Sequence, residues 1–198
     1  MEKRKYSGEI DLKLLQEFNA AAIAVTDHCG YLHPGDIPHH IYNGNKYYDP
    51  DEVITIWEDE RGVAAWLLVN VRFNGFDAQL RPDMRGGDLE REVLGIAYER
   101  TAEHINKFEI DCEHIYADAF RGDTARIQVL EELGWEPGGE VPYVLTRTEI
   151  NAIAVPDLPH GFTFRSATGR EDAAALAEVH NAAFSPNWTP ELYRYVME

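Results

Sequence analysis

The sequence has few cysteines, few basic residues and no long apolar run. Its two cysteines, Cys29 and Cys112, lie far apart with no C-x-x-C spacing, so we expect buried thiols rather than reactive ones. No run approaches the ~18 apolar residues that a membrane-spanning helix needs. The N-terminal segment, MEKRKYSGEI, lacks the apolar core of a secretory signal. These absences predict a cytoplasmic protein with no membrane partner.

Acidic residues outnumber basic ones by a wide margin. Lysine and arginine together number 18 against 35 aspartates and glutamates, which gives a net charge of −17. A surface of this sign repels phosphate backbones and anionic lipids, so nucleic acid is not expected as a partner. Such a surface can attract a cationic amine or a basic peptide, although acidic composition often serves solubility alone. The 198 residues suit one full domain, or one domain and part of another.

Apolar periodicity predicts a helix, a long irregular stretch and three strands in the first part of the chain. The helix is expected over 9–24, where one face gathers Leu12, Leu15, Phe18 and Ala22. Residues 29–52 are rich in the turn formers Gly, Pro, Asn and Asp and are expected to be irregular. Strands are expected at 53–59, 62–71 and 72–80, the first two joined by a tight turn.

The next segment continues the same mixed α/β unit. A helix is predicted over 88–107, because apolar residues recur at helical spacing, acids begin it and basic residues follow later. A strand is expected over 114–120. Asp123 can cap the next helix, Gly134 suits its C-terminal end, and a last strand is expected over 141–149.

The final part of the chain is predicted to be a linker followed by one strand and two helices. Residues 150–161 contain the proline and glycine that are typical of linkers. A strand is expected at 162–167, before a helix that begins at the capping-box pair Thr168 and Glu171. Thr189 and the proline after it open a further helix. One strand and two helices cannot bury a core alone, so this part must pack on the first domain or belong to a second one.

Two motifs resemble the GCN5-related N-acetyltransferase (GNAT) superfamily, whose members move an acetyl group from acetyl-CoA to an amine. The first is LRPDMRGGDLEREVL, similar to the family's strand, arginine-glycine turn and helix. The second is DTARIQVLEELGWEPGGEVPYVLTRTE, similar to its closing helix and strand. The resemblance implies an acyl-CoA N-acyltransferase-like fold, an α/β architecture in which helices flank a central mixed sheet.

The resemblance also implies a division of the chain. Residues 1–149 correspond to one GNAT-like domain and 150–161 to a linker. Residues 162–198 resemble the opening strand and helices of a second copy, incomplete in this chain, as in a tandem acetyltransferase. The first copy has no obvious opening strand before its first helix, so an alternative is that 162–167 completes the first sheet.

The family's turn wraps the pyrophosphate of acetyl-CoA with backbone N–H groups, which requires small residues and no negative charge. Carried onto this sequence, the cofactor-binding positions are Leu80, Arg85, Gly86 and Gly87. Asp88 and Glu90 stand at the next two positions, where the family has small residues. Two unit charges ~4 Å apart at an effective dielectric of ~20 repel by about 4 kcal/mol. The resemblance therefore implies acetyl-CoA as co-substrate, and the two acids predict that this copy binds it poorly.

The family's catalytic positions also differ here. Leu130 matches the tyrosine that commonly donates a proton to the departing thiolate, and an apolar side chain cannot do so. Asp123 and Arg126 match the family's asparagine and small residue in the same motif. Asp77 can face the cleft as a base for the substrate ammonium, the alternative being an ordinary solvated strand residue.

The segment YLHPGDIPHH admits a zinc interpretation through His33, Asp36, His39 and His40. Its prolines and glycine shape a turn, and Asp36 can cap the segment that follows, so no metal site is predicted. In the family, acceptor contacts come from this part of the chain, so the expected partner is a small-molecule or peptide amine. The tryptophans of the strands and of the ELGW motif are expected in the core, Trp57, Trp66 and Trp135.

Three functions follow from these patterns. The first is a degenerate N-terminal copy of a tandem acetyltransferase, which serves structure or substrate enclosure. The second is a working acetyltransferase that binds acetyl-CoA despite the acids. The third is a non-catalytic ligand-binding or dimerisation module, which allows a homodimer.

Overall fold

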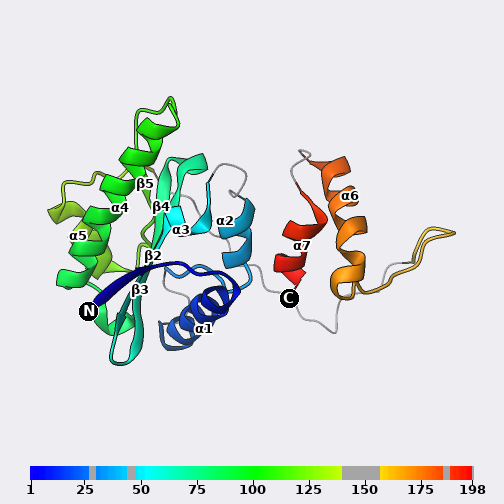
Figure 1. The fold of residues 1–198 in the computed structure, drawn as a ribbon, viewed down its shortest axis with the longest axis horizontal. Helices are drawn as coiled ribbons and strands as arrows, with labels where there is room; N and C mark the ends of the chain where they lie inside the picture. The colour runs from blue at the N-terminus through cyan, green and yellow to red at the C-terminus, as the bar shows by residue number, and fades with distance from the viewer. Residues whose placement is uncertain (27–29, 44–47, 140–156, 185–187, 198) are drawn as a thin grey trace.

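The computed structural model describes residues 1–26, 30–43, 48–139, 157–184 and 188–197, and they form a mixed α/β protein (Figure 1). A five-stranded sheet has the order β1-β2-β3-β4-β5, in which β5 runs parallel to β4 and the other neighbours are antiparallel. The strands are β1 (Glu2–Lys5), β2 (Ile54–Asp59), β3 (Gly62–Asn70), β4 (Gly75–Leu80) and β5 (Tyr116–Ala117). The predicted α/β class with a mixed sheet is therefore confirmed.

The sheet has an opening strand before its first helix. β1 pairs antiparallel with β2 at the edge of the sheet. Its side chains form ion pairs on both faces, Lys3 with Glu92 at 2.8 Å and Arg4 with Asp11 at 2.7 Å. The expectation that an opening strand is lacking was wrong, because β1 consists only of charged residues and shows no apolar pattern. Residues 162–167 form no strand and do not complete the sheet.

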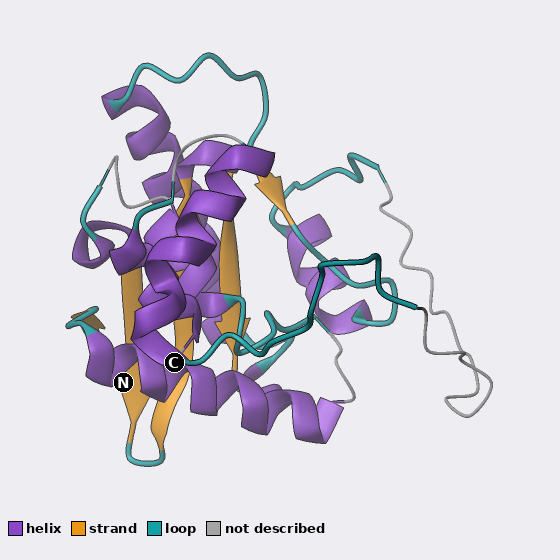
Figure 2. Cartoon of the chain, turned by 90° about the vertical axis from the view of Figure 1, so that its right-hand side faces the viewer, coloured by secondary structure: helices purple, strands orange, loops and turns teal. Residues whose placement is uncertain are grey.

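Helices cover both faces of the sheet (Figures 1 and 2). On one face α1 (Glu9–Thr26) contacts β3, and its buried Asn19 accepts a hydrogen bond from Trp66 Nε1 at 3.0 Å. On the other face α4 (Asp88–Lys107) packs on β3 and β4, beside α5 (Thr124–Glu132). Trp57 and Trp66 are fully buried, as predicted, whereas Trp135 is half-buried.

Helix prediction was accurate for the amphipathic elements and incomplete in the long polar stretch. The helix expected over 88–107 has these bounds in the structure, and the one expected over 9–24 extends to Thr26. Within 29–52 the chain forms two short helices that were not predicted, α2 (Ile37–Asn43) and α3 (Pro50–Val53).

The strands after β1 follow the prediction with shorter bounds, and α5 is capped as predicted. β5 covers only part of the strand expected over 114–120. Asp123 caps α5, accepting a hydrogen bond from the backbone N–H of Arg126, and Gly134 takes a left-handed φ of 84° just after the helix. The strand expected over 141–149 lies outside the described residues.

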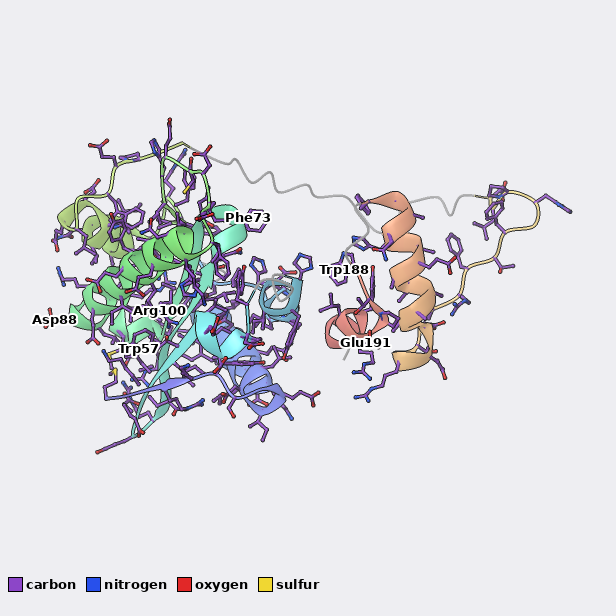
Figure 3. The ribbon with its side chains drawn as sticks, turned by 45° about the horizontal axis from the view of Figure 1, so that its top comes forward. Trp57, Phe73, Asp88, Arg100, Trp188 and Glu191 are labelled. Atoms are coloured by element: carbon purple, nitrogen blue, oxygen red, sulfur yellow. The ribbon has the colours of Figure 1, made fainter. Side chains whose placement is uncertain are left out.

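The last described segments form a helical hairpin against α2. α6 (Ala173–Ala183) and α7 (Pro190–Met197) pack together, and α7 also packs on α2. Trp188, labelled in Figure 3, stacks on His39 of α2, with ring centroids 5.3 Å apart. Thr189 caps α7 as predicted. The helix predicted to begin at the capping-box pair Thr168 and Glu171 instead begins at Ala173, and the backbone N–H of Thr168 donates to Asp172 at 2.7 Å rather than to Glu171. Before α6, Phe162 and Phe164 are 69% and 78% exposed.

In the part of the chain that the structure describes, every helix is too short or too polar to cross a membrane.

Candidate functional site

The arginine-glycine turn lies between the end of β4 and the start of α4, as the sequence predicted. Leu80 ends the strand and is fully buried. Gly86 has a φ of 74°, a left-handed conformation that disfavours other residues, and a Cβ there would lie 3.1 Å from Cβ of Ala125. Gly87 is the N-cap of α4. The unpaired N–H groups of this turn and helix end suit an anion.

The anion at this turn is Glu90 of the protein itself. Its side chain is 0% exposed. Oε2 accepts a hydrogen bond from the backbone N–H of Gly86 at 2.6 Å, and Oε1 accepts one from Nε of Arg126 at 2.8 Å. Asp88 instead points into solvent and is fully exposed (Figure 3). The two acids, expected to act alike, therefore differ: Glu90 occupies the turn and Asp88 lies outside it.

Arg126 reaches from α5 into the space beside β4. β5 pairs with β4 only at Gly75 and Phe76, so the later part of β4 has no partner from β5. Arg126 donates from Nη2 to the carbonyl oxygen of Ala78 at 2.6 Å, two residues beyond that pairing. Its side chain is almost entirely buried. The guanidinium that binds this part of β4 is thus already neutralised by Glu90.

Arg85 turns inward as well. Its guanidinium forms an ion pair with Asp123, donates to the carbonyl oxygen of Gly30 at 3.2 Å and lies 4.2 Å from the ring centroid of Tyr31. Burial lowers the pKa of Arg85, and the nearby charge of Arg126 lowers it further. The arginine that the motif assigns to phosphate binding is therefore engaged with protein groups.

Two neighbouring side chains tie this network to the fold. Tyr31 donates its hydroxyl to the carbonyl oxygen of Leu80 at 2.6 Å, and burial raises the pKa of that phenol. Asp123 pairs with Arg85 through one oxygen and caps α5 through the other, 3.2 Å from the N–H of Arg126. Leu130, at the position of the family's tyrosine, is buried in the apolar core.

The cluster has balanced charge. Two guanidinium groups, from Arg85 and Arg126, face two carboxylates, from Asp123 and Glu90. Buried ions are stable only when their partners are complete, and these four satisfy one another with additional backbone contacts. A free phosphate would have to displace Glu90 before it could reach the N–H of Gly86.

Comparisons with known protein families, with curated proteins and with solved structures found no match. The resemblance to the GNAT superfamily thus stays a prediction from the motifs, and the geometry of the site carries the functional argument.

A second group of polar side chains lies on the opposite face of the sheet. Asp77 of β4 lies 3.5 Å from Nδ1 of His40, measured from Oδ2, and its side chain is 15% exposed. The Asp77 carboxylate raises the pKa of His40, with smaller contributions from Asp36 and Asp118. Burial raises the pKa of Asp118, and the charge of Asp77 adds to the effect. Asp77 is therefore not a plain solvated residue, since it is half-buried beside an imidazole.

The histidines considered for a zinc site each contact a different partner. His33 Nδ1 accepts the backbone N–H of Gly35 at 3.1 Å, whereas His39 contacts Trp188 and His40 contacts Asp77. Within the described ranges no three His, Cys, Asp or Glu side chains are grouped as metal ligands.

Sequence reasoning identified the turn and missed the residues that close it. Arg126 appeared only as a mismatch to a motif, and Tyr31 and His40 lay in a stretch expected to be irregular. The available signal was charge: an arginine on the otherwise buried face of α5 needs a carboxylate, and Glu90 stands on the buried face of α4.

Proposed function

We propose that this chain is a GNAT-like, acyl-CoA N-acyltransferase-like domain whose pyrophosphate turn is closed by its own carboxylate, followed by the start of a second GNAT-like copy. The order of three antiparallel strands, a glycine turn, a helix, a parallel strand and a helix agrees with the resemblance of the two motifs. In this proposal the domain supports or encloses a substrate, and acetyl transfer belongs to a complete copy.

One observation carries the proposal: the carboxylate of Glu90 binds the turn at which the family resemblance implies a pyrophosphate. It accepts the turn N–H of Gly86 and the guanidinium of Arg126, and it is fully buried. An incoming pyrophosphate at ~4 Å from this carboxylate meets a repulsion of about 4 kcal/mol at an effective dielectric of ~20. Moving Glu90 away leaves the buried Arg126 without its partner, which is also unfavourable.

The exposed phenylalanines before α6 support the second-copy part of the proposal. Phe162 and Phe164 alternate with Thr163 and Arg165, which is the pattern of a strand with one buried face. Both rings are exposed and the segment forms no strand. The pattern is explained if these residues belong to a sheet that a complete second copy provides.

A ligand-binding module is the second candidate function, favoured by the Asp77, His40 and Asp118 group. Two carboxylates and an imidazole on the α1 and α2 face suit a small or peptide amine, because an ammonium group can pair with Asp77 without crossing the closed turn. This function needs no acetyl-CoA.

Thermal unfolding with and without millimolar acetyl-CoA tests the first proposal. The unaltered protein and Asp88→Gly are expected to show no shift in Tm, because Asp88 lies outside the turn. Glu90→Ala frees the N–H of Gly86 and the guanidinium of Arg126, so its Tm is expected to rise with acetyl-CoA. A ligand at one hundred times its Kd stabilises by about 2.7 kcal/mol.

A shift in the unaltered protein would overturn the closed-turn proposal. Because Glu90→Ala can itself destabilise the fold, Glu90→Gln serves as a second variant that keeps an acceptor for Gly86 and removes the charge. The amine-binding candidate is tested separately with propylamine: Asp77→Asn is expected to abolish any propylamine-dependent shift, and the absence of a shift in the unaltered protein would reject this candidate.

A further inference from the structure

A pocket lies near the edge strand, on the face of the sheet that α4 covers. It has a volume of about 250 Å³ and opens to solvent. Its lining comes from the end of β1, from α3 and from the last turns of α4, namely Lys5, Glu52, Glu103, His104 and Lys107. All of these side chains are ionisable. A ligand here would be held by charge and hydrogen bonds rather than by apolar burial.

His104 lines this pocket with a mostly buried ring. The residue is 8% exposed, and its Nδ1 lies 2.8 Å from the carbonyl oxygen of Arg100. Because a carbonyl only accepts, Nδ1 carries the proton, and Nε2 of the neutral ring is an acceptor. Neither Nε2 nor the carboxylate of the adjacent Glu103 receives a hydrogen bond from the residues that the structure describes. Two neighbouring acceptors are thus available to a donor.

Two lysines also line the pocket, and Lys107 lies one helical turn after Glu103 on α4. Lys107 Nζ lies 3.3 Å from Glu52, and Lys5 Nζ lies 3.5 Å from Asp51, both in exposed pairs that exchange easily with a ligand. Beneath them Arg100 donates to the Thr55 hydroxyl and to the carbonyl oxygen of Glu52 (Figure 3). Arg100 forms no ion pair within the described part of the chain; burial lowers its pKa, and the charge of Glu103 opposes that shift.

We propose that this pocket binds a small zwitterion, such as a free α-amino acid. Its ammonium group would meet Glu103 and Nε2 of His104, and its carboxylate would meet Lys5 and Lys107.

The presence of both charges in the lining favours a zwitterion over a simple ion. A simple anion would approach a protein with a net charge of −17 and would leave the two acceptors unused. A simple cation would lie near Arg100 and the lysines. The contacts are partly exposed, so affinity in the millimolar range is expected. This site is separate from the turn, because it lies at the opposite end of α4.

NMR of the His104 ring tests the proposal, with glycine as the zwitterionic probe and His104→Gln used to assign the signal. Glycine is expected to shift the Cε1–H resonance saturably, whereas acetate and methylammonium at equal ionic strength leave it nearly unchanged. Glu103→Gln and Lys107→Gln alter exposed side chains and should each weaken glycine binding about threefold to fivefold. Glu99→Gln, exposed on the same helix, is the matched control and should bind glycine normally.

Three results would overturn the proposal. The first is no saturable shift with glycine up to about 50 mM, which corresponds to less than ~2 kcal/mol of binding. The second is an equal shift with acetate alone, which indicates an anion site. The third is an equal shift with methylammonium alone, which indicates a cation site.

Discussion

The guanidinium of Arg126 donates to the carboxylate of Glu90 across 2.8 Å, and both side chains are buried. They come from α5 and α4, and together they fill the turn and the space beside β4. Removing one partner leaves the other as an uncompensated buried charge, which makes this pair the most sensitive point of the site.

Glu90→Ala is expected to lower the free energy of unfolding by about 3–5 kcal/mol. Asp88→Ala, two positions earlier, should change it by less than ~0.5 kcal/mol, because Asp88 is fully exposed. Urea unfolding of both variants measures the difference. Equal effects would contradict the distinct roles assigned to the two acids.

Replacing both partners of the pair by apolar residues should restore much of this loss. In the variant carrying Glu90→Leu and Arg126→Met no buried charge is left alone, although the acceptor of Gly86 and the donor to Ala78 are absent. A double-mutant cycle with the two single variants gives the coupling energy. A loss in the double variant equal to the sum of the two single losses would show that the pair is not coupled.

Asp123→Asn should be milder than Asp123→Ala. Asparagine still caps α5, whereas alanine loses the cap, which contributes about 1 kcal/mol. Both variants lose the ion pair with Arg85, so neither should match the unaltered protein. Urea unfolding separates the two contributions, and identical stability of the two variants would argue against the capping role.

Gly86→Ala is expected to destabilise the turn by about 1–2 kcal/mol, because alanine is strained at a φ of 74° and its Cβ would crowd Ala125. Gly87→Ala is the matched comparison. Gly87 has a φ of −100°, and the nearest atom to an added Cβ lies at 3.6 Å. It should be clearly less destabilising in the same thermal unfolding experiment. The reverse order would mean that the turn adopts another conformation.

The pKa of His40 is raised above its usual 6.5 by Asp77. The stabilising contribution of the charged imidazole is therefore complete below the unfolded value of about 6.5 and is lost as pH rises through the higher folded pKa. NMR titration of His40 should give a pKa above 6.5 in the unaltered protein and a lower one in Asp77→Asn, where only burial and the weaker charges remain. The same His40 pKa in both proteins would show that Asp77 does not raise it.

The amphipathic elements could be predicted from the sequence because their burial is periodic. The bounds of α4 agree with the prediction since acids at its start and apolar residues at helical spacing indicate the same element. α2 was missed because its proline suggested a turn, although Pro38 lies in the first turn of the helix, where proline is tolerated. β1 was missed because its contacts are ionic.

The position of the candidate site could be predicted from the sequence, but the contacts between its side chains could not. The motif located the turn at Arg85, Gly86 and Gly87, and the acidic residues after it suggested a closed site. Which acid enters the turn depends on the orientation of α4, and its partner Arg126 lies 36 positions away along the chain. Local spacing carries no information about a contact of that kind, which depends on how α5 packs on the sheet.

The charged side chains of β1 also affect how this protein meets other chains. An edge strand offers unpaired backbone groups, and flat apolar edges recruit further strands into extended stacks. Here Lys3 and Arg4 lie on opposite faces of that edge, each bound to an acid of a covering helix. A strand added at β1 would have to be accommodated among these fixed ion pairs, so this border of the sheet is protected against edge-to-edge aggregation.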